Sequence, residues 1–344
     1  MARALSTKTR VLFLLLILAV FLSLPRFTPQ YMSIFLYQLF LYMILAVSYD
    51  ILGGYAGYMN LGHACFFGIG GYTFAILANR NFGLASSMAG GMLTTACFAV
   101  LISYPFFRLR GAYFALANLG LIILLGLLAH NLKPLTGGAD GLFIPITYEL
   151  NSVYYASLTL CILTIFLSYR VGKSRYGLAL VSIRADEDAA STFGVNPYWY
   201  KVGAMVMGAL PASLAGSIFA WALTYINPDS LLGIEIALMP VTMAMLGGTG
   251  FVAGPILGCA FISVVQELVW TKLPYLHLAI YGAMLILIGL YMPGGLIRIK
   301  MFQRVLAKFG LSERLYWHGS KAVPGSKEWH SSKEKGSEKD LADL

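Results

Sequence analysis

Runs of apolar residues, most of them long enough to cross a bilayer, dominate this chain. A spanning helix needs about 20 such residues. Only 11% of the 344 residues are charged, against about 25% in a soluble domain. The sequence therefore predicts an all-α, polytopic transmembrane helix bundle with about ten spans. They cover roughly residues 11–25, 32–52, 56–78, 84–107, 112–130, 153–170, 202–225, 232–248, 252–270 and 277–292.

The distribution of Lys and Arg between the spans predicts their orientation, because cytoplasmic loops carry an excess of these residues. With a cytoplasmic N terminus, fifteen of the nineteen basic residues before Gly319 fall inside and four fall outside. The count favours cytoplasmic N and C termini and an even number of spans.

The end of the chain has a different composition. From Gly319 onward it is rich in Lys, Glu, Ser and Gly, a composition that cannot bury a core and is typical of disorder. We therefore expect a transmembrane domain over residues 1–300. A cytoplasmic tail over 301–344 follows it, disordered from about residue 319.

Two glycine-rich interruptions resemble each other. The first break, residues 53–57 (GGYAG), precedes Asn60-Leu-Gly62, and the second break, residues 247–250 (GGTG), precedes Ala253-Gly-Pro255. Interrupted helices at corresponding places in two halves are typical of transporters whose pathway runs between the halves. A match this short also arises by chance.

Polar side chains inside spans are costly, and they often mark a pathway. Six candidates are Asp50, Asn60, His63, Asn118, Glu235 and Glu267, of which the last two can also simply lie at the outer interface. On a helix, Asn60 and His63 would share one face. That face could line a translocation pathway together with Asn118, or the side chains could bond neighbouring carbonyls.

Small residues recur at helical spacing. Gly250, Gly254 and Gly258 form a GxxxGxxxG pattern, which lets helix backbones approach closely in lipid. We assign these glycines to helix packing. The four cysteines stand alone in apolar runs with no CxxC pair, so we expect core side chains and no metal site.

A charged segment interrupts the membrane pattern near residue 186. Asp186-Glu-Asp188 opens it, Ala189 and Ala190 follow, and Gly194 ends it. An acidic first turn and a terminal Gly are typical of a short capped helix. Such a helix, here on the cytoplasmic side, can enter a groove on another protein or can simply be solvated.

The chain has no nucleotide-binding loop of its own. Gly172-Lys-Ser174 matches the end of a P-loop, but Leu167 stands where that motif requires Gly. No Ser/His/Asp or HExxH pattern is present either. We therefore predict a protein that is not an enzyme and that depends on a separate subunit if ATP drives it.

The charged segment resembles a family signature. Asp188-Ala-Ala-x-x-x-Gly194 is similar to the EAA loop of ABC import permeases, which docks into a cleft on the cytoplasmic ATPase. The first acid is Asp instead of Glu, and Leu210-Pro211 comes later than in the short form of the signature. The resemblance implies an ATPase-coupling loop over residues 172–201, with contacts made by Glu187, Asp188, Ala189, Ala190 and Gly194.

Longer blocks in order resemble the branched-chain amino acid permeases of the LivM type. They cover about residues 40–295 and are GYAGYMNLGHACFFGIGGY at 54–72, RLRGAYF at 108–114, TGGADGL at 136–142 and MLGGTGFVAGP at 245–255. The resemblance implies a permease subunit of an ABC importer in the bacterial inner membrane that carries Leu, Ile and Val.

The same resemblance implies partners. These are a homologous permease, two cytoplasmic ATPase subunits that hold ATP and Mg, and a periplasmic substrate-binding protein. This chain would itself bind no cofactor and no nucleic acid. The alternatives are a urea or short-amide ABC permease and a stand-alone, ion-coupled secondary carrier.

Overall fold

The computed structural model of the chain describes residues 7–146, 149–272 and 295–296. The chain divides into two units. One is Val20–Arg298, and the other is Met1–Ala19 with Ile299–Leu344. Of the second unit only residues 7–19, the start of helix α1, are described. The predicted tail from residue 301 lies outside the described residues.

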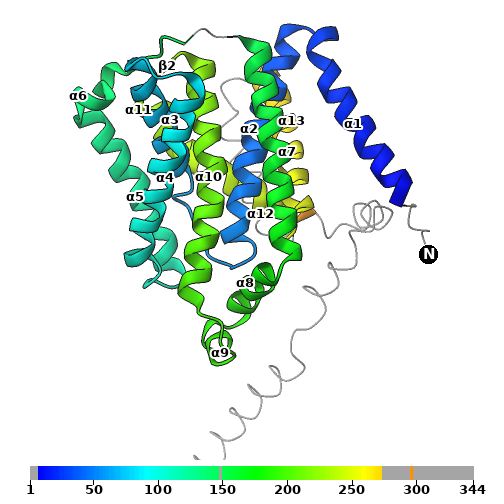
Figure 1. Cartoon of the computed structure of the whole chain (residues 1–344), viewed down its shortest axis with the longest axis vertical. Coiled ribbons are helices and arrows are strands. Elements are labelled where there is room, and N and C mark those ends of the chain that lie inside the picture. Colours follow the sequence, from blue (N-terminus) through cyan, green and yellow to red (C-terminus); the bar gives the residue numbers. More distant parts are fainter. Residues whose placement is uncertain (1–6, 147–148, 273–294, 297–344) are drawn as a thin grey trace, which may run out of the picture. The chain divides into compact units, whose positions relative to one another are not determined.

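The described residues are almost entirely helical, as the sequence predicts (Figure 1). The longer helices are α1 (Thr7–Phe27), α2 (Gln30–Gly53), α3 (Ala64–Asn79), α4 (Leu84–Phe106), α5 (Ala112–Asn131), α7 (Leu150–Lys173), α8 (Arg175–Ala185), α10 (Pro197–Leu223), α12 (Ile234–Gly247) and α13 (Ala253–Lys272). The short elements are α6 (Lys133–Thr136), η1 (Gly138–Asp140), β1 (Leu142–Phe143), α9 (Glu187–Thr192), β2 (Tyr225–Ile226) and α11 (Pro228–Leu232).

Six helical segments in the described part are long and apolar enough to cross a membrane: α2, α4, α5, α7, α10 and residues 228–247, which comprise α11 and α12. Three shorter apolar stretches are Leu18–Phe27 within α1, Ala64–Asn79, which is α3, and Ala253–Leu268 within α13. Nine of the ten predicted spans overlap helices, but only six segments of the described residues are long and apolar enough to cross a membrane, so the number of ten spans is not confirmed. The tenth, 277–292, lies outside the described residues.

Two predicted spans are interrupted by non-helical backbone. The span predicted over 56–78 becomes helical only at Ala64, because residues 57–60 are non-helical and Gly57 has a φ of 76°. In the span predicted over 232–248, Gly233 adopts an extended conformation between α11 and α12. The positive φ of Gly57 is a conformation that glycine favours, whereas the extended backbone at Gly233 is open to any residue.

Helix α10 is the centre of the bundle and contacts α2, α3, α4 and α7. Small residues on α10 let the neighbouring backbones approach. A Cβ added at Gly216 would lie 1.9 Å from the carbonyl oxygen of Phe67 on α3, and one at Gly208 would lie 2.7 Å from that of Ser48 on α2. Close backbone packing of this kind is the usual basis of helix association in lipid.

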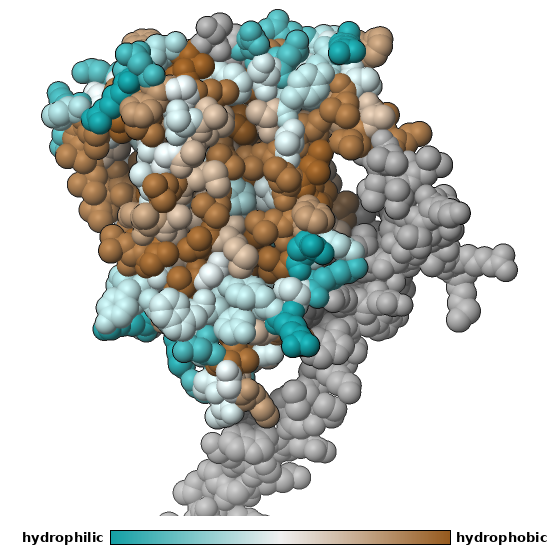
Figure 2. Space-filling model, viewed as in Figure 1, coloured by the Kyte–Doolittle hydropathy of each residue, from teal (hydrophilic) through white to brown (hydrophobic). Residues whose placement is uncertain are grey.

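The surface of the bundle is apolar in its middle. Figure 2 shows a hydrophobic band between hydrophilic ends on the face in view. Helices α4 and α5 contribute strongly exposed apolar side chains to the surface, such as Leu101 at 72% exposure and Leu116 at 62%. An apolar surface this extensive fits contact with lipid.

The two ends of the bundle differ. At one end, β1 pairs with β2 in antiparallel register, with Leu142 opposite Ile226 and Phe143 opposite Tyr225. At the other end, α8 follows α7 and contacts α10, and α9 projects beyond the ends of both membrane-length helices α7 and α10 (Figure 1). We call this the α9 end.

The packing of α10 against α3 predicts a strong effect of one added methyl group. Gly216→Ala should destabilise the protein by about 1–3 kcal/mol, the usual cost of overpacking, because the nearest atoms are backbone and cannot rotate away. Thermal unfolding of the purified protein in detergent measures this. Gly120→Ala on α5 is the matched control, since a Cβ there meets nothing within 4 Å. Equal melting temperatures for both variants would contradict the packing account.

Candidate functional site at the α9 end

Helix α9 is short but well defined at both ends. Asp186 caps it, because its carboxylate accepts hydrogen bonds from the backbone N–H groups of Asp188 and Ala189, each at 2.9 Å. The chain turns away after Thr192, and Gly194 adopts a φ of 83° that glycine favours. The acidic start and glycine end explain why these residues form an isolated helical turn.

The first residue of α9 is anchored to two other parts of the bundle. The carboxylate of Glu187 accepts a hydrogen bond from the ammonium of Lys201 on α10 at 2.6 Å and one from the hydroxyl of Tyr58 at 2.5 Å. Lys201 is only 2% exposed, and its Nζ lies 4.6 Å from the ring centroid of Tyr58 and 5.3 Å from that of Phe107. A buried ion pair persists only with such additional partners.

These contacts keep Glu187 charged. Burial alone would raise the pKa of Glu187, but the hydrogen bonds from Lys201 and Tyr58 and the charge of Lys201 outweigh it. The pKa of Glu187 therefore lies below its ordinary value. The same arrangement raises the pKa of Tyr58, through burial first and its hydrogen bond to Glu187 second.

The opposite side of α9 is open. Asp188 is exposed and pairs with the exposed Arg110 at 3.1 Å, a contact of a kind that contributes about 0–1 kcal/mol. Ala189 and Gly194 are also exposed, whereas Ala190 is buried. Of the residues that the resemblance assigns to ATPase coupling, Glu187 and Ala190 thus face the bundle and Asp188, Ala189 and Gly194 face outward.

The two glycine breaks meet at the α9 end. The carboxylate of Asp50, fully buried near the end of α2, accepts the backbone N–H of Gly250 at 2.9 and 3.1 Å to its two oxygens. Gly54 packs directly against this hydrogen bond. A Cβ added at Gly54 would lie 1.8 Å from Asp50 Oδ1 and 2.5 Å from the Gly250 nitrogen, so only glycine fits at this position. Segments 200 residues apart in sequence are thus joined at one carboxylate.

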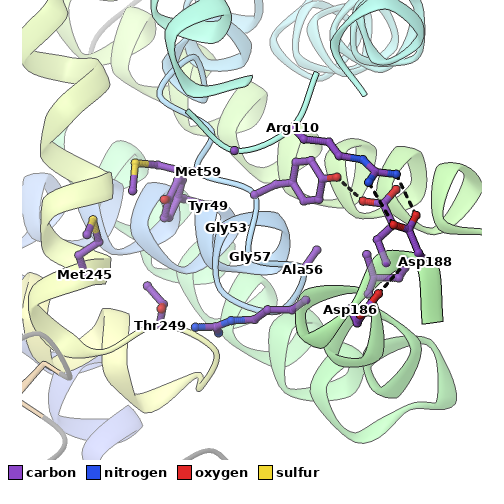
Figure 3. A pocket seen from close by; sticks show the side chains of 15 residues that line it. Tyr49, Gly53, Ala56, Gly57, Met59, Arg110, Asp186, Asp188, Met245 and Thr249 are labelled. Carbon is purple, nitrogen blue, oxygen red and sulfur yellow. Dashed lines mark hydrogen bonds and ion pairs between the residues drawn. The ribbon is translucent and has the colours of Figure 1, made fainter. Parts of the chain in front are cut away.

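A cavity of about 600 Å³ lies between the breaks and α9. Both breaks line it, through Gly53, Gly57 and Thr249 among others. In Figure 3, Met59 and Met245 lie on one side and the charged groups of Arg110, Asp186 and Asp188 on the other. Tyr49 and Thr249 lie on the methionine side, so the cavity has a mixed lining on that side and charged groups on the other.

The predicted pathway residues are buried, but they are not arranged as the spacing suggested. Asn60 and His63 precede α3 in non-helical and turn backbone, so the prediction that they share a helix face is wrong. His63 Nε2 lies 2.9 Å from Ser48 Oγ, and Asn118 Nδ2 donates to the carbonyl of Phe114 on its own helix. The Oδ1 of Asn60 is buried and has no hydrogen-bond partner among the described residues.

The GxxxGxxxG pattern is divided between a turn and a helix. Gly250 lies before α13 with a φ of 88°, so the prediction of a helical position is wrong there. Gly254 and Gly258 lie on α13, where an added Cβ would come within 1.7 Å of the Gly248 carbonyl and 1.9 Å of the Met243 carbonyl, respectively. These two glycines allow α13 to pack against α12 and the turn that follows it.

Among the described residues, no group of three or more His, Cys, Asp or Glu side chains is placed to hold a metal ion. Cys65, Cys161 and Cys259 are buried and Cys97 is exposed, all four as free thiols.

Comparison with known proteins decides the family. The sequence model of a family described as "Branched-chain amino acid transport system / permease component" matches residues 31–289. The chain belongs to this family.

Curated relatives include permeases of branched-chain amino acid transport systems. The permease is 27% identical over 327 residues to the high-affinity branched-chain amino acid transport system permease protein LivM of Salmonella typhimurium, covering 85% of this chain and 76% of the relative. It is 27% identical over 288 residues to the LivH protein of that system from Escherichia coli, covering 74% and 91%. No solved structure matches it significantly.

A more distant relative carries another substrate name. The autoinducer 2 import system permease protein LsrC of Yersinia pestis is 27% identical over 217 residues, covering 60% of this permease and 61% of the relative. The predicted resemblance to LivM-type permeases and the multi-pass inner-membrane location are confirmed.

Three side chains that hold the site together are not predicted from the sequence. Tyr58 lies inside a block that carries the family resemblance, and Arg184 and Lys201 contribute to the sequence analysis only through the count of basic residues in the loops. A lysine among the apolar residues of a long helix, fourteen residues after Glu187, is a signal for a buried ion pair. Nothing in the sequence indicates that Arg184 reaches the first break.

The anchor of α9 predicts a pH effect. Since the folded-state pKa of Glu187 is lowered, its contribution is complete above the ordinary pKa of about 4.3 and disappears only as pH falls through the lower folded value. Hydrogen exchange of residues 187–194 should therefore show equal protection at pH 5 and pH 7 after correction for intrinsic rates.

Lys201→Met should loosen α9 by roughly tenfold or more in exchange rate, the effect of losing a charge-assisted hydrogen bond. Without the ammonium, burial should raise the pKa of Glu187, so protection in this variant should be weaker at pH 7, where the carboxylate is charged, than at pH 5. Lys173→Met, an exposed position at the end of α7, is the control. Wild-type protection in Lys201→Met at both pH values would contradict the anchor.

Proposed function

We propose that this permease is the membrane-spanning subunit of an ABC importer for branched-chain amino acids. ATP hydrolysis on separate cytoplasmic subunits drives it, and the α9 end faces the cytoplasm. The family, the names of the LivM and LivH relatives and the excess of basic residues in the loops on that side support the proposal.

The observation that carries the proposal is the construction of α9. One side is fixed to the bundle by the buried Glu187–Lys201 pair, and the other side projects beyond the spanning helices. Phe193 at its end is 88% exposed and Trp199 nearby is 66% exposed. Exposed aromatic rings beside an acidic turn form a compact surface for a partner, since aromatic side chains often anchor protein interfaces.

The partner on this surface is an ATPase subunit, which holds ATP and Mg. The permease is similar to both LivM and LivH, two permeases with the same printed system name, and this supports pairing with a homologous permease. A periplasmic substrate-binding protein completes the importer and delivers the amino acid to the end of the bundle where β1 and β2 lie.

The pathway runs through the buried polar residues toward the cavity. Asn60, His63 and Asn118 line it, supported by their burial and by the unpaired Asn60 oxygen, because a buried polar group normally finds a partner. The cavity, with Met59 and Met245 on one side and charges on the other, receives a zwitterion with an apolar side chain. ATP binding closes the ATPases, moves α9 and opens this exit.

Substrate identity is tested on the cognate binding protein. Calorimetric titration should show binding of Leu, Ile and Val and no binding of urea or acetamide. Binding of urea alone would replace the proposal by a urea permease, and binding of autoinducer 2 would place the permease with its LsrC relative.

The docking role of α9 predicts the effect of Asp188→Lys. The Arg110 pair that this change removes is exposed, so the melting temperature should change little. ATPase subunits that copurify with the permease should decrease by about tenfold or more, because the change reverses a charge within the interface. Phe193→Asp should have the same effect.

Asp140→Lys, an exposed charge reversal at the opposite end, is the matched control and should retain the ATPase subunits. Normal copurification and uptake in both Asp188→Lys and Phe193→Asp would exclude α9 as the docking element.

A further inference from the structure

Arg184, near the end of α8, occupies a slot formed by both glycine breaks. Its Cγ lies 2.8 Å from where a Cβ of Gly57 would stand, and its Nη1 lies 3.1 Å from where a Cβ of Gly250 would stand. Both glycines have positive φ values, so a side chain at either position would be strained as well as crowded. The slot exists because these positions are glycine.

The guanidinium also completes the end of a membrane helix. Arg184 Nη1 donates a hydrogen bond to the carbonyl oxygen of Gly54, the residue that follows the last turn of α2. A cation is favourable at this end of a helix, where carbonyl groups lack intrahelical partners. Gly54 is in turn packed against Asp50 and Gly250.

Arg184 is closely connected to α9. It precedes the capping residue Asp186 by two positions, and its neighbour Ile183 is 3% exposed in the core. A displacement of α9 that is passed along the chain to α8 would move the guanidinium relative to the Gly54 carbonyl. The Arg184 side chain is therefore a link between the chain segment at the start of α9 and the place where the breaks meet, besides the hydrogen bond from Tyr58 to Glu187.

We propose that Arg184 is a positioning residue that holds the two glycine breaks together and transmits movement of α9 to them. This inference rests on the proposed function, in which α9 moves with the ATPase. In the resting state Arg184 and the Asp50–Gly250 bond keep the breaks closed beside the cavity. When α9 is displaced, Arg184 leaves the Gly54 carbonyl and the breaks separate.

The test measures the separation of the breaks directly. Met59 follows the first break and Met245 precedes the second, and both are exposed, at 41% and 49%. Each is replaced by Cys and spin-labelled in the complete transporter in nanodiscs, with the exposed Cys97 changed to Ser. Pulsed electron double resonance then gives the distance distribution without nucleotide and with ATP and vanadate.

We expect one narrow distance in the nucleotide-free wild type. Arg184→Met keeps the stem but loses the hydrogen bond, and should raise the ratio of separated to closed populations by about tenfold. It should also abolish the response to ATP and vanadate. Arg175→Met, an exposed arginine at the start of the same helix, should behave as wild type.

An unchanged nucleotide-free distribution in Arg184→Met would overturn the proposal. If that variant does not accumulate as a folded complex, Arg184→Gln serves in its place, and an unchanged distribution there overturns it equally. Failure of the proposed function gives a different result from failure of this inference. If the proposed function is wrong, the distance in the wild type does not change with nucleotide, but Arg184→Met still shifts the nucleotide-free distribution.

Discussion

The hydrogen bond between the buried Asp50 carboxylate and the backbone N–H of Gly250 is the contact on which this end of the bundle depends. It joins the end of α2 to the turn between α12 and α13, which are far apart in sequence. A fully buried carboxylate is costly unless it is hydrogen-bonded. The bond forms only because Gly54 and Gly250 carry no Cβ, so the breaks meet backbone to backbone.

The cavity and the anchoring of α9 follow from this junction. The breaks that Asp50 holds together form one wall of the cavity, and Tyr58, just after the first break, reaches Glu187 at the start of α9. Lys201 fixes the same carboxylate to α10. The first residue of α9 is therefore charged and partly buried, whereas Phe193 just after its end is exposed. A helix that is anchored to the bundle at its first residue and exposed at its last can transmit a movement from a partner into the bundle.

Much of this architecture could be predicted from local sequence patterns. The apolar runs indicate the long helices, because length and hydropathy alone decide whether a helix can cross lipid. The capped helix at α9 follows from Asp186 and Gly194, whose effects are local. Even the similarity of the two glycine breaks was visible, although not that they are in contact.

The rest depends on tertiary contacts that local patterns do not contain. The spacing of Asn60 and His63 predicts a shared helix face, but α3 begins only at Ala64, after both residues. The spacing of Gly250, Gly254 and Gly258 predicts one helix, but a positive φ keeps Gly250 outside it. The sequence shows Lys201 only as a charge at the start of a span, because its partner Glu187 becomes its neighbour only when the chain folds.

The central claim is that ATP on the α9 side drives uptake through this permease. Its most direct test is transport of labelled leucine by proteoliposomes that contain this chain, its homologous permease, the ATPase subunits and the binding protein. The account predicts accumulation only when ATP is present on the α9 side, and none with an ion gradient alone. Accumulation by this chain alone, driven by an ion gradient without ATP, would contradict it.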